Sequence, residues 1–307
     1  MALASWMLAE DPRVEEISVS VNGHRMHCLT TGNGPAVVLL HGLLGSARAW
    51  YPCFSRLGQG SFVYAVDSLG IGESERVPGL DASLAAHADR MAEFLTAAGI
   101  DRADITGTSH GGAVAMMLAA RHPERVRSLV LHAPANPLSL LGDPMVRFYR
   151  TSLGRWFAHQ VPSLPEKLQE LALGRMYGNN KVVRHEVLDR YMSSLRVPGT
   201  VQHVMNIIEC WFEDMRQLGA VLDKLRDVPT LLVWGTHDRA VSLESGRQLE
   251  KLLHRSELVI LPGVGHLPHD EAPLAFADVV SGFLRRIDRS EAHLGPQLVR
   301  PEASGSV

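Results

Sequence analysis

Short apolar runs alternate with helical segments along most of this chain, and no other feature constrains its fold more strongly. The largely apolar runs of strand length are residues 36–40, 62–66, 103–106, 128–131, 230–234 and 258–261. Such runs are typical of parallel strands that helices cover on both faces. Ahead of them, the pair Asn22-Gly23 between two alternating runs predicts a hairpin. The pattern therefore predicts an α/β protein with a mostly parallel central sheet.

The alternation is interrupted once, over residues 137–224. This stretch has no strand pattern, and its helical segments are separated by Pro162, Pro165, Gly178 and Pro198. We therefore predict a core domain made of residues 1–136 and 225–288, which a helical cap over 137–224 divides. The charged tail at 289–307, which contains glycine and proline, is predicted to be disordered.

The predicted cap is rich in aromatic side chains. Of the 18 aromatic residues in the chain (8 Phe, 5 Tyr, 5 Trp), the cap holds Phe148, Tyr149, Trp156, Phe157, Tyr177, Tyr191, Trp211 and Phe212. Such side chains either line an adaptable apolar pocket or form the core of the cap itself. Trp156 and Trp211 are the candidates for a substrate pocket.

Composition and charge exclude several classes of protein. Lysine and arginine number 30 against 33 acidic residues, and the net charge of −3 predicts no nucleic-acid partner. The three cysteines, Cys28, Cys53 and Cys210, are too far apart for a disulfide framework and fit a reducing compartment. Residues 1–10 do not form a convincing secretory signal, and no 18-residue apolar span occurs. A cytoplasmic protein without a membrane span is therefore expected, and its oligomeric state stays open.

One glycine-rich segment has the spacing of a nucleophile turn. Residues 107–111 (GTSHG) match the pattern G-x-S-x-G, with a strand run before them and a helical segment after them. In this setting the chain turns so sharply that a Cβ at either glycine would clash, and the serine is lifted clear of the sheet. The segment predicts Ser109 as a nucleophile.

A serine needs a base, and two later loops provide candidates. His266 lies just past the last predicted strand, and Asp238 lies just past the strand before it. The carboxyl ends of parallel strands meet at one edge of a sheet, where such proteins build their sites. We therefore expect His266 to act as the base of Ser109, with Asp238 as the acid that orients it.

Four segments, in this order, resemble motifs of the α/β-hydrolase superfamily over about residues 15–287. They are residues 41–43 (HGL), similar to its oxyanion loop; 67–74 (DSLGIGES), similar to the turn after its fourth strand; and 234–238 (WGTHD) and 265–268 (GHLP), similar to its acid and histidine segments. The chain order of serine, aspartate and histidine is also that of this superfamily.

The resemblance implies an α/β-hydrolase fold with helices on both faces of the sheet and a helical cap. It further implies an oxyanion hole formed by the backbone N–H groups of Leu43 and His110. Related members with an aspartate nucleophile hydrolyse epoxides or carbon–halogen bonds, and Ser109 argues against both activities. Members that cleave carbon–carbon bonds in ring-fission products often carry an aromatic residue after the histidine, where this chain has Leu267.

Other roles for these residues have to be weighed. The side chains His237, Asp238, His266, His269 and Asp270 could be drawn as a metal site. His266 cannot easily serve both a metal and Ser109, so the metal site is the weaker interpretation.

Three neighbouring residues have simpler explanations than catalysis. His41 is expected to order its own loop, and Asp67 is expected to form a turn through local hydrogen bonds. Asp270 stands at a predicted helix start, where a carboxylate is favoured.

We therefore expect a serine hydrolase that cleaves a small-to-medium apolar carboxylic ester through an acyl-enzyme, without a cofactor. The partner is a small apolar molecule. Two alternatives stay open: a carbon–carbon bond hydrolase that uses the same three residues, and a ligand-binding receptor with slow turnover. The sequence does not identify the acyl group, the alcohol or the pathway.

Overall fold

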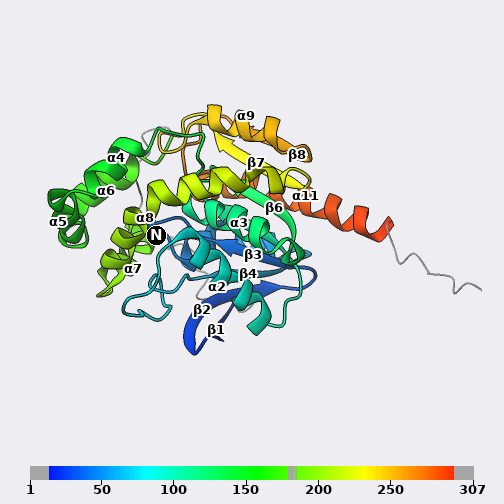
Figure 1. Ribbon diagram of the computed structural model, residues 1–307, viewed down its shortest axis with the longest axis horizontal. Helices are drawn as coiled ribbons and strands as arrows, with labels where there is room; N and C mark the ends of the chain where they lie inside the picture. Colours follow the sequence, from blue (N-terminus) through cyan, green and yellow to red (C-terminus); the bar gives the residue numbers. More distant parts are fainter. Residues whose placement is uncertain (1–13, 179–182, 184, 294–307) are drawn as a thin grey trace, which may run out of the picture.

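The computed structural model of the chain describes residues 14–178, 183 and 185–293 (Figure 1). Within these residues, eight strands form one sheet in the order β1-β2-β4-β3-β5-β6-β7-β8. The strands are β1 (Glu15–Val21), β2 (His24–Gly32), β3 (Ala36–Leu40), β4 (Phe62–Val66), β5 (Ala103–Thr108), β6 (Val126–His132), β7 (Thr230–Gly235) and β8 (Ser256–Leu261). Only the β1–β2 and β2–β4 pairs are antiparallel among the described strands. The structure confirms the predicted fold with its mostly parallel sheet.

The predicted hairpin is formed by β1 and β2. Its two turn residues, Asn22 and Gly23, have φ angles of 51° and 83°. Both values lie in the left-handed region that a two-residue hairpin turn of type I′ requires. The Asn-Gly turn thus fixes the register of β1 against β2, the antiparallel pair that comes before the parallel strands of the described sheet.

Helices cover both faces of the sheet because alternate side chains of each strand point to opposite sides. In β3, Val37 and Leu39 pack against α1 (Tyr51–Leu57) and α11 (Pro273–His293). Val38 and Leu40 face the layer that contains α2 (Leu84–Ala97), α3 (His110–Arg121) and α9 (Leu243–Leu252). Short helical turns complete the connections: η2 (Ala47–Trp50), η3 (Pro123–Arg125) and α10 (Pro268–Glu271).

Between β6 and β7 the described residues contain helices and no strand. They are α4 (Asp143–Tyr149), α5 (Ser152–Gln160), η4 (Val161–Ser163), α6 (Glu166–Gly174), α7 (His185–Arg196), α8 (Thr200–Val221) and η5 (Leu222–Leu225), here called the helical insertion. Figure 1 shows α4–α7 gathered at one end of the molecule, while α8 runs back along α3. A shared apolar cluster joins the insertion to the loops of the core, with Tyr191 and Ile207 on one side and Ile71 and Leu267 on the other. The predicted domain boundaries at 137 and 224 stay a prediction.

The last helix differs from the expectation. The tail that the sequence predicts to be disordered begins at residue 289, whereas α11 continues to His293. Its buried stripe runs on through Leu284 to Ile287, and the first glycine after these residues is Gly295. Without a stop signal the helix takes up the start of the predicted tail. Residues 294–307, the rest of that tail, lie outside the described residues.

Two glycines allow α3 to approach the sheet closely. A Cβ atom added to Gly111 would lie 2.5 Å from the carbonyl oxygen of His41, and it would also clash with the carbonyl oxygen of Leu40. A Cβ atom on Gly107 would run into the backbone of Gly111. The start of α3 therefore lies in direct contact with the end of β3, which brings the turn at residue 109 to the edge of the sheet.

Replacing Gly111 with alanine should destabilise the protein, because the rigid backbone of β3 cannot move away from the new methyl group. We expect the free energy of unfolding to fall by about 1–3 kcal/mol. The matched control is Gly282→Ala in α11, where the added Cβ atom meets only the end of a flexible arginine. It should leave stability unchanged or raise it by up to about 1 kcal/mol. Denaturant unfolding measures both; a fully stable Gly111→Ala protein would contradict the packing argument.

Candidate active site

Ser109 occupies a strained turn between β5 and α3. Its φ and ψ angles are 50° and −119°, a conformation that non-glycine residues seldom adopt. The Ser109 N–H group donates to the carbonyl of His132 (3.1 Å), and its own carbonyl accepts from the amides of Gly112 (3.0 Å) and Ala135 (2.9 Å). Such strain persists only where the surrounding structure over-determines it, and it clusters at functional sites. The sequence-predicted nucleophile is therefore held by backbone contacts on both sides.

Asp238 and His266 form a buried pair. Their side chains are 0% and 2% exposed, and the His266 Nδ1–H donates to Asp238 Oδ2 at 2.8 Å. The other carboxylate oxygen, Oδ1, accepts from the amides of Ala240 (2.8 Å) and Val241 (3.0 Å). Both oxygens are thus fixed, and the hydrogen bond at Nδ1 leaves His266 Nε2 as the acceptor nitrogen.

Ser109, Asp238 and His266 come from neighbouring strands. They follow β5, β7 and β8, whose carboxyl ends lie along the same edge of the sheet. His132, at the end of β6, links them in space, because its carbonyl binds Ser109 N while its ring lies 6.3 Å from that of His266. The structure thus brings the three sequence-predicted residues to one edge, as the strand order requires.

The loop after β3 lies beside Ser109. A Cβ atom on Gly42 would be 3.4 Å from the Cβ of Ser109. His41 orders this loop, as expected: its Nδ1–H donates to the Gly42 carbonyl (2.8 Å), and its Nε2 accepts from the amide of Ser68 (3.2 Å). Leu43, a predicted oxyanion donor, follows directly in this loop. His110, the other predicted donor, is the first residue of α3.

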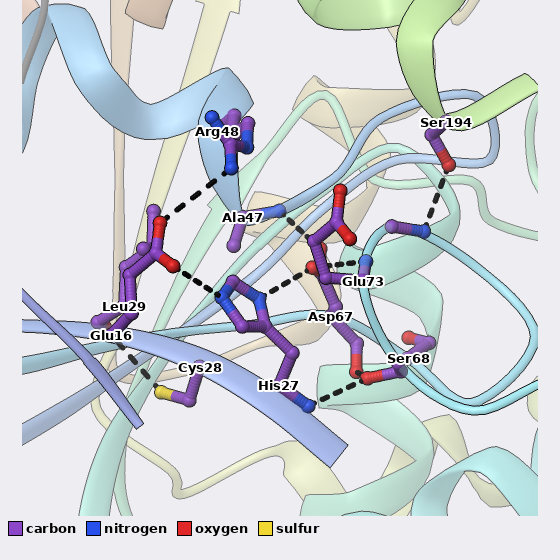
Figure 2. Close-up of polar contacts among 12 residues, drawn as sticks. Glu16, His27, Cys28, Leu29, Ala47, Arg48, Asp67, Ser68, Glu73 and Ser194 are labelled. Atoms are coloured by element: carbon purple, nitrogen blue, oxygen red, sulfur yellow. Dashed lines mark hydrogen bonds and ion pairs between the residues drawn. The ribbon is translucent and has the colours of Figure 1, made fainter. Parts of the chain in front are cut away.

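Asp67 does more than form a local turn (Figure 2). The expected local contact exists, since Oδ2 accepts from the amide of Glu73 at 2.9 Å. The buried carboxylate also accepts from the amide of Ala47 (2.6 Å) and from His27 Nδ1 (2.8 Å), both distant in the sequence. Burial alone would raise the pKa of Asp67, but the hydrogen bonds from His27 and these amides hold it below the ordinary value. Asp67 thereby fixes the far end of the loop that carries Leu43.

The network continues from His27 to the protein surface. Glu16 Oε2 lies 3.9 Å from His27 Nε2, and Arg48 pairs with the same glutamate at 3.5 Å (Figure 2). Glu16 comes from β1 and Arg48 from η2, so this network of polar side chains joins the hairpin to the loop after β3. We interpret it as a structural network.

Sequence reasoning missed Glu271, which binds the loop of His266 to the helical insertion. Glu271 Oε1 accepts from the amide of Gly265 (2.9 Å), and Oε2 accepts from that of Gly178 in the insertion (2.8 Å). A second link is direct, because the amide of His266 donates to the carbonyl of Met176 (2.7 Å). The only sequence signal for this role is an acidic residue five positions after the histidine.

Asp270 also has a partner that the sequence did not indicate. It lies in the first turn of α10, as expected for a carboxylate at a helix start. It is also buried and pairs with Arg190 of α7, while the hydroxyl of Tyr191 donates to its Oδ2 at 3.0 Å. The explanation from the helix start alone is therefore incomplete, because Asp270 also anchors the insertion to the core.

Three buried imidazoles surround the start of α3. The ring of His87 lies 5.3 Å from that of His110 and 5.7 Å from that of His203. Burial is the main cause that lowers the pKa of His110 to about 3 and of His203 to about 4, and it lowers the pKa of His87 well below its usual value. Next to Ser109 the protein therefore presents neutral imidazoles.

The two pocket candidates differ in their surroundings. Trp211 stacks on the ring of His110, with centroids 6.5 Å apart and an angle of 27° between the planes. It therefore packs next to the residue that follows Ser109. Trp156 lies on α5 with 60% of its surface exposed. For both residues a contact with substrate stays a prediction.

The five residues considered for a metal site do not form a set of three ligands, although Asp238 and His266 form a pair. His237 contacts the hydroxyl of Thr236 (2.9 Å), and His269 lies 3.3 Å from the hydroxyl of Tyr191. Within residues 14–178, 183 and 185–293, no group of three histidine, cysteine or acidic side chains could hold a metal ion. Among the helices in these ranges, none is long and apolar enough to cross a membrane.

The imidazole cluster predicts that acid destabilises the protein. An unfolded histidine has a pKa of about 6.5, whereas the pKa values of His110 and His203 in the folded protein are about 3 and about 4. Between these values the unfolded state binds more protons, so the free energy of unfolding falls as pH falls from about 6.5 to about 4. Burial raises the pKa of Asp214 to about 6 and also raises that of Asp104, and these two groups act in the opposite direction. Against them, burial lowers the pKa of six histidines among the described residues.

Thermal unfolding between about pH 7 and pH 4.5 tests this expectation. The melting temperature should fall with pH in the parent protein and fall less in His87→Phe, which keeps an aromatic ring without a titrating group. An equal fall in both proteins would show that His87 is not a source of the pH dependence.

Known proteins resemble this chain over most of its length. A family model described as the alpha/beta hydrolase fold matches residues 35–273. A 2-hydroxymuconate semialdehyde hydrolase from Pseudomonas putida is 31% identical over 87% of this chain and 92% of its own length. A pimeloyl-(acyl-carrier protein) methyl ester esterase from Nitrosomonas europaea is 29% identical over 82% of this chain and 96% of its own length.

Solved structures agree with this relationship. The crystal structure of a membrane phospholipase A, a bacterial virulence factor, has a TM-score of 0.75 and is 29% identical, over 90% of this chain and 87% of that one. The fold, the strained turn at Ser109 and the family match lead to one conclusion: the chain is a hydrolase that belongs to the α/β-hydrolase fold family.

Proposed function

We propose that this hydrolase cleaves a small-to-medium apolar carboxylic ester, with Ser109 as nucleophile, His266 as base and Asp238 as the orienting acid. The observation that carries the proposal is the hydrogen bond of 2.8 Å between His266 and Asp238 at the sheet edge where Ser109 stands. A nucleophile, a base and a group that orients the base are the parts that acyl transfer requires.

In this proposal, Ser109 Oγ attacks the ester carbonyl while His266 Nε2 accepts the hydroxyl proton. The backbone N–H groups of Leu43 and His110 stabilise the negative charge on the carbonyl oxygen. His266 then gives the proton to the departing alcohol, which leaves an acyl group on Ser109. Water, deprotonated by His266, attacks the acyl carbonyl, and the acid leaves as His266 returns the proton to Ser109 Oγ. Asp238 keeps the proton of His266 on Nδ1 throughout, which leaves Nε2 facing the reaction. No cofactor takes part.

Two features support an apolar ester as the substrate. Trp211 and the neutral imidazole of His110 pack beside the nucleophile and add no charge there. One relative is a methyl ester esterase, and one structural relative is a phospholipase, and both names describe ester cleavage. We therefore propose ester cleavage for this chain, without assigning it the particular substrates of these two relatives.

The second candidate is hydrolysis of a carbon–carbon bond with the same three residues. It is favoured by relatives that include 2-hydroxymuconate semialdehyde and 2-hydroxy-6-oxo-6-phenylhexa-2,4-dienoate hydrolases. Against it stands Leu267, which follows the histidine where such enzymes often carry an aromatic residue. Leu267 is buried against the helical insertion. The two reactions differ in the bond that breaks, so substrate rates separate them.

Replacing Ser109 with alanine should abolish turnover while the protein still folds. We expect the rate with a short-chain nitrophenyl ester to fall by at least about 10⁴-fold, because the nucleophile is lost. A fluorophosphonate should label the parent and an exposed-serine control, Ser152→Ala, but not Ser109→Ala. Labelling of Ser109→Ala at the parental rate would place the nucleophile elsewhere.

The parent should also hydrolyse the ester with a higher kcat/KM than a vinylogous diketone of the ring-fission type. The reverse order of rates, with labelling still at Ser109, would favour the second candidate. Stoichiometric binding of either compound with no measurable turnover would instead indicate a ligand-binding receptor.

Asp238→Asn should lower turnover by about 10⁴-fold, since an amide stabilises the wrong tautomer of His266. Asp270→Asn and Asp67→Asn are matched controls, because each removes a buried carboxylate that does not bind His266. Asp270 pairs with Arg190, and Asp67 accepts from the amide of Ala47. They should lower the melting temperature and keep turnover within about tenfold of the parent. If Asp238→Asn stays within tenfold while Asp270→Asn loses activity, the acid has been assigned to the wrong residue.

A further inference from the structure

One histidine of the core is buried completely although its ring has no hydrogen bond. His132 ends β6 and is 0% exposed. Within residues 14–178, 183 and 185–293, neither of its ring nitrogens has a hydrogen-bond partner. A polar group buried in this way destabilises a protein, and an apolar side chain of similar size would not. The stability of the fold therefore gives no reason for a histidine at this position.

The ring of His132 packs against the proposed base. Its centroid lies 6.3 Å from that of His266, 5.2 Å from that of His269 and 5.5 Å from that of Phe276. The side chain of His266 is itself only 2% exposed, so neighbouring protein groups, and not bulk water, set the polarity around its ring. His132 is one of these groups.

The backbone at the end of β6 is strained. Ala133, the residue after His132, has a φ of 37°, and among the described non-glycine residues only Asn22 and Ser109 share a positive φ. The amide of Ala133 donates to the carbonyl of Val233 (3.0 Å), and the carbonyl of His132 accepts from the amide of Ser109 (3.1 Å). Strain of this kind persists where the surroundings impose it, and it clusters at functional sites. The end of β6 is therefore fixed beside the nucleophile.

His132 is uncharged at neutral pH. Burial is the main cause that lowers its pKa well below the usual value, and His269 and His266 lower the pKa further. A contact with the backbone of His266, outside hydrogen-bond geometry, raises it in part. A neutral imidazole has one N–H donor and one acceptor nitrogen. Since neither nitrogen of His132 is bonded, both are available to respond to a charge on His266.

The other polar side chains around His266 already have partners. They are Asp238, His269, Asp270, Arg190 and Tyr191. Each of them makes at least one hydrogen bond or ion pair, whereas the ring of His132 makes none within the described part of the chain. His132 is thus the uncommitted dipole next to the base.

We propose that His132 is a positioning residue that acts through His266, by stabilising the imidazolium that forms when His266 Nε2 takes the proton of Ser109 Oγ. A buried positive charge needs polar neighbours. Asp238 supplies one at Nδ1, and the neutral ring of His132 supplies another. The charge exists only until the proton passes to the departing alcohol, so the interaction favours the transition state over the ground state. The inference rests on the proposed role of His266 as the base.

Two substitutions of His132 separate this role from a structural one, with a short-chain nitrophenyl ester as substrate. His132→Leu removes the dipole, so kcat should fall by at least about tenfold while KM stays within about twofold of the parent. Its melting temperature should equal or exceed that of the parent, because no unpartnered polar group is buried. His132→Gln keeps a polar group of similar reach and should recover most of kcat. Its melting temperature should not exceed that of His132→Leu.

The matched control is His87→Leu, which removes another buried imidazole with an unpartnered Nε2, one that faces His110 and His203. It should keep the parental kcat. The proposal is overturned if His132→Leu keeps the parental kcat, or if it melts at a lower temperature than the parent, because stability would then explain the histidine. An equal loss of kcat in His87→Leu also overturns it.

The variants Ser109→Ala and Asp238→Asn distinguish this failure from that of the proposed function. If both keep the parental turnover, the proposed function itself is wrong. If both lose turnover and His132→Leu does not, only the role of His132 is wrong.

Discussion

The close approach of α3 to the end of β3 is the constraint on which the rest of the site depends. Gly111 lies against the carbonyls of Leu40 and His41 because it has no Cβ atom. This contact sets the turn at Ser109 directly beside Gly42, so the serine and the loop after β3 share one edge of the sheet. The hydrogen bonds of Asp67 and His41 then fix that loop from its other side. Ser109 and the loop after β3 are thus positioned by close backbone contact on one side and by two buried side chains on the other.

The histidine side of the site is built differently, because its supports come from distant parts of the chain. Asp238 orients the ring of His266, while Met176 and Glu271 hold the backbone around it. The insertion therefore completes the scaffold of the core and does not merely lie over it. Asp270 and Arg190 strengthen the same junction with a buried ion pair. An isolated charge at this depth would be costly, so the two residues depend on each other.

Features set by neighbouring residues can be predicted from the sequence, whereas contacts between residues far apart in the sequence cannot. The strands, the Asn22-Gly23 hairpin and the turn at Ser109 depend on neighbouring residues, and all appear where the sequence predicts them. The charged residues from 289 onward continue α11 to His293, although their composition predicts disorder, because no helix stop precedes Gly295. The contacts of Glu271 and Asp67 could not be predicted, since their partners lie up to 93 residues away.

The junction between the insertion and the histidine loop has a consequence for how such a protein can diversify. Two of its contacts use main-chain groups of the insertion, the carbonyl of Met176 and the amide of Gly178, and a further contact uses the side chain of Arg190. Any residue could supply that carbonyl, whereas position 178 must stay glycine because a Cβ atom would lie 2.8 Å from the amide nitrogen of Gly265. A substitution at Met176 can therefore leave this support of the His266 loop in place. The backbone position of His266 is thus independent of which side chain stands at 176 and depends on the lack of one at 178.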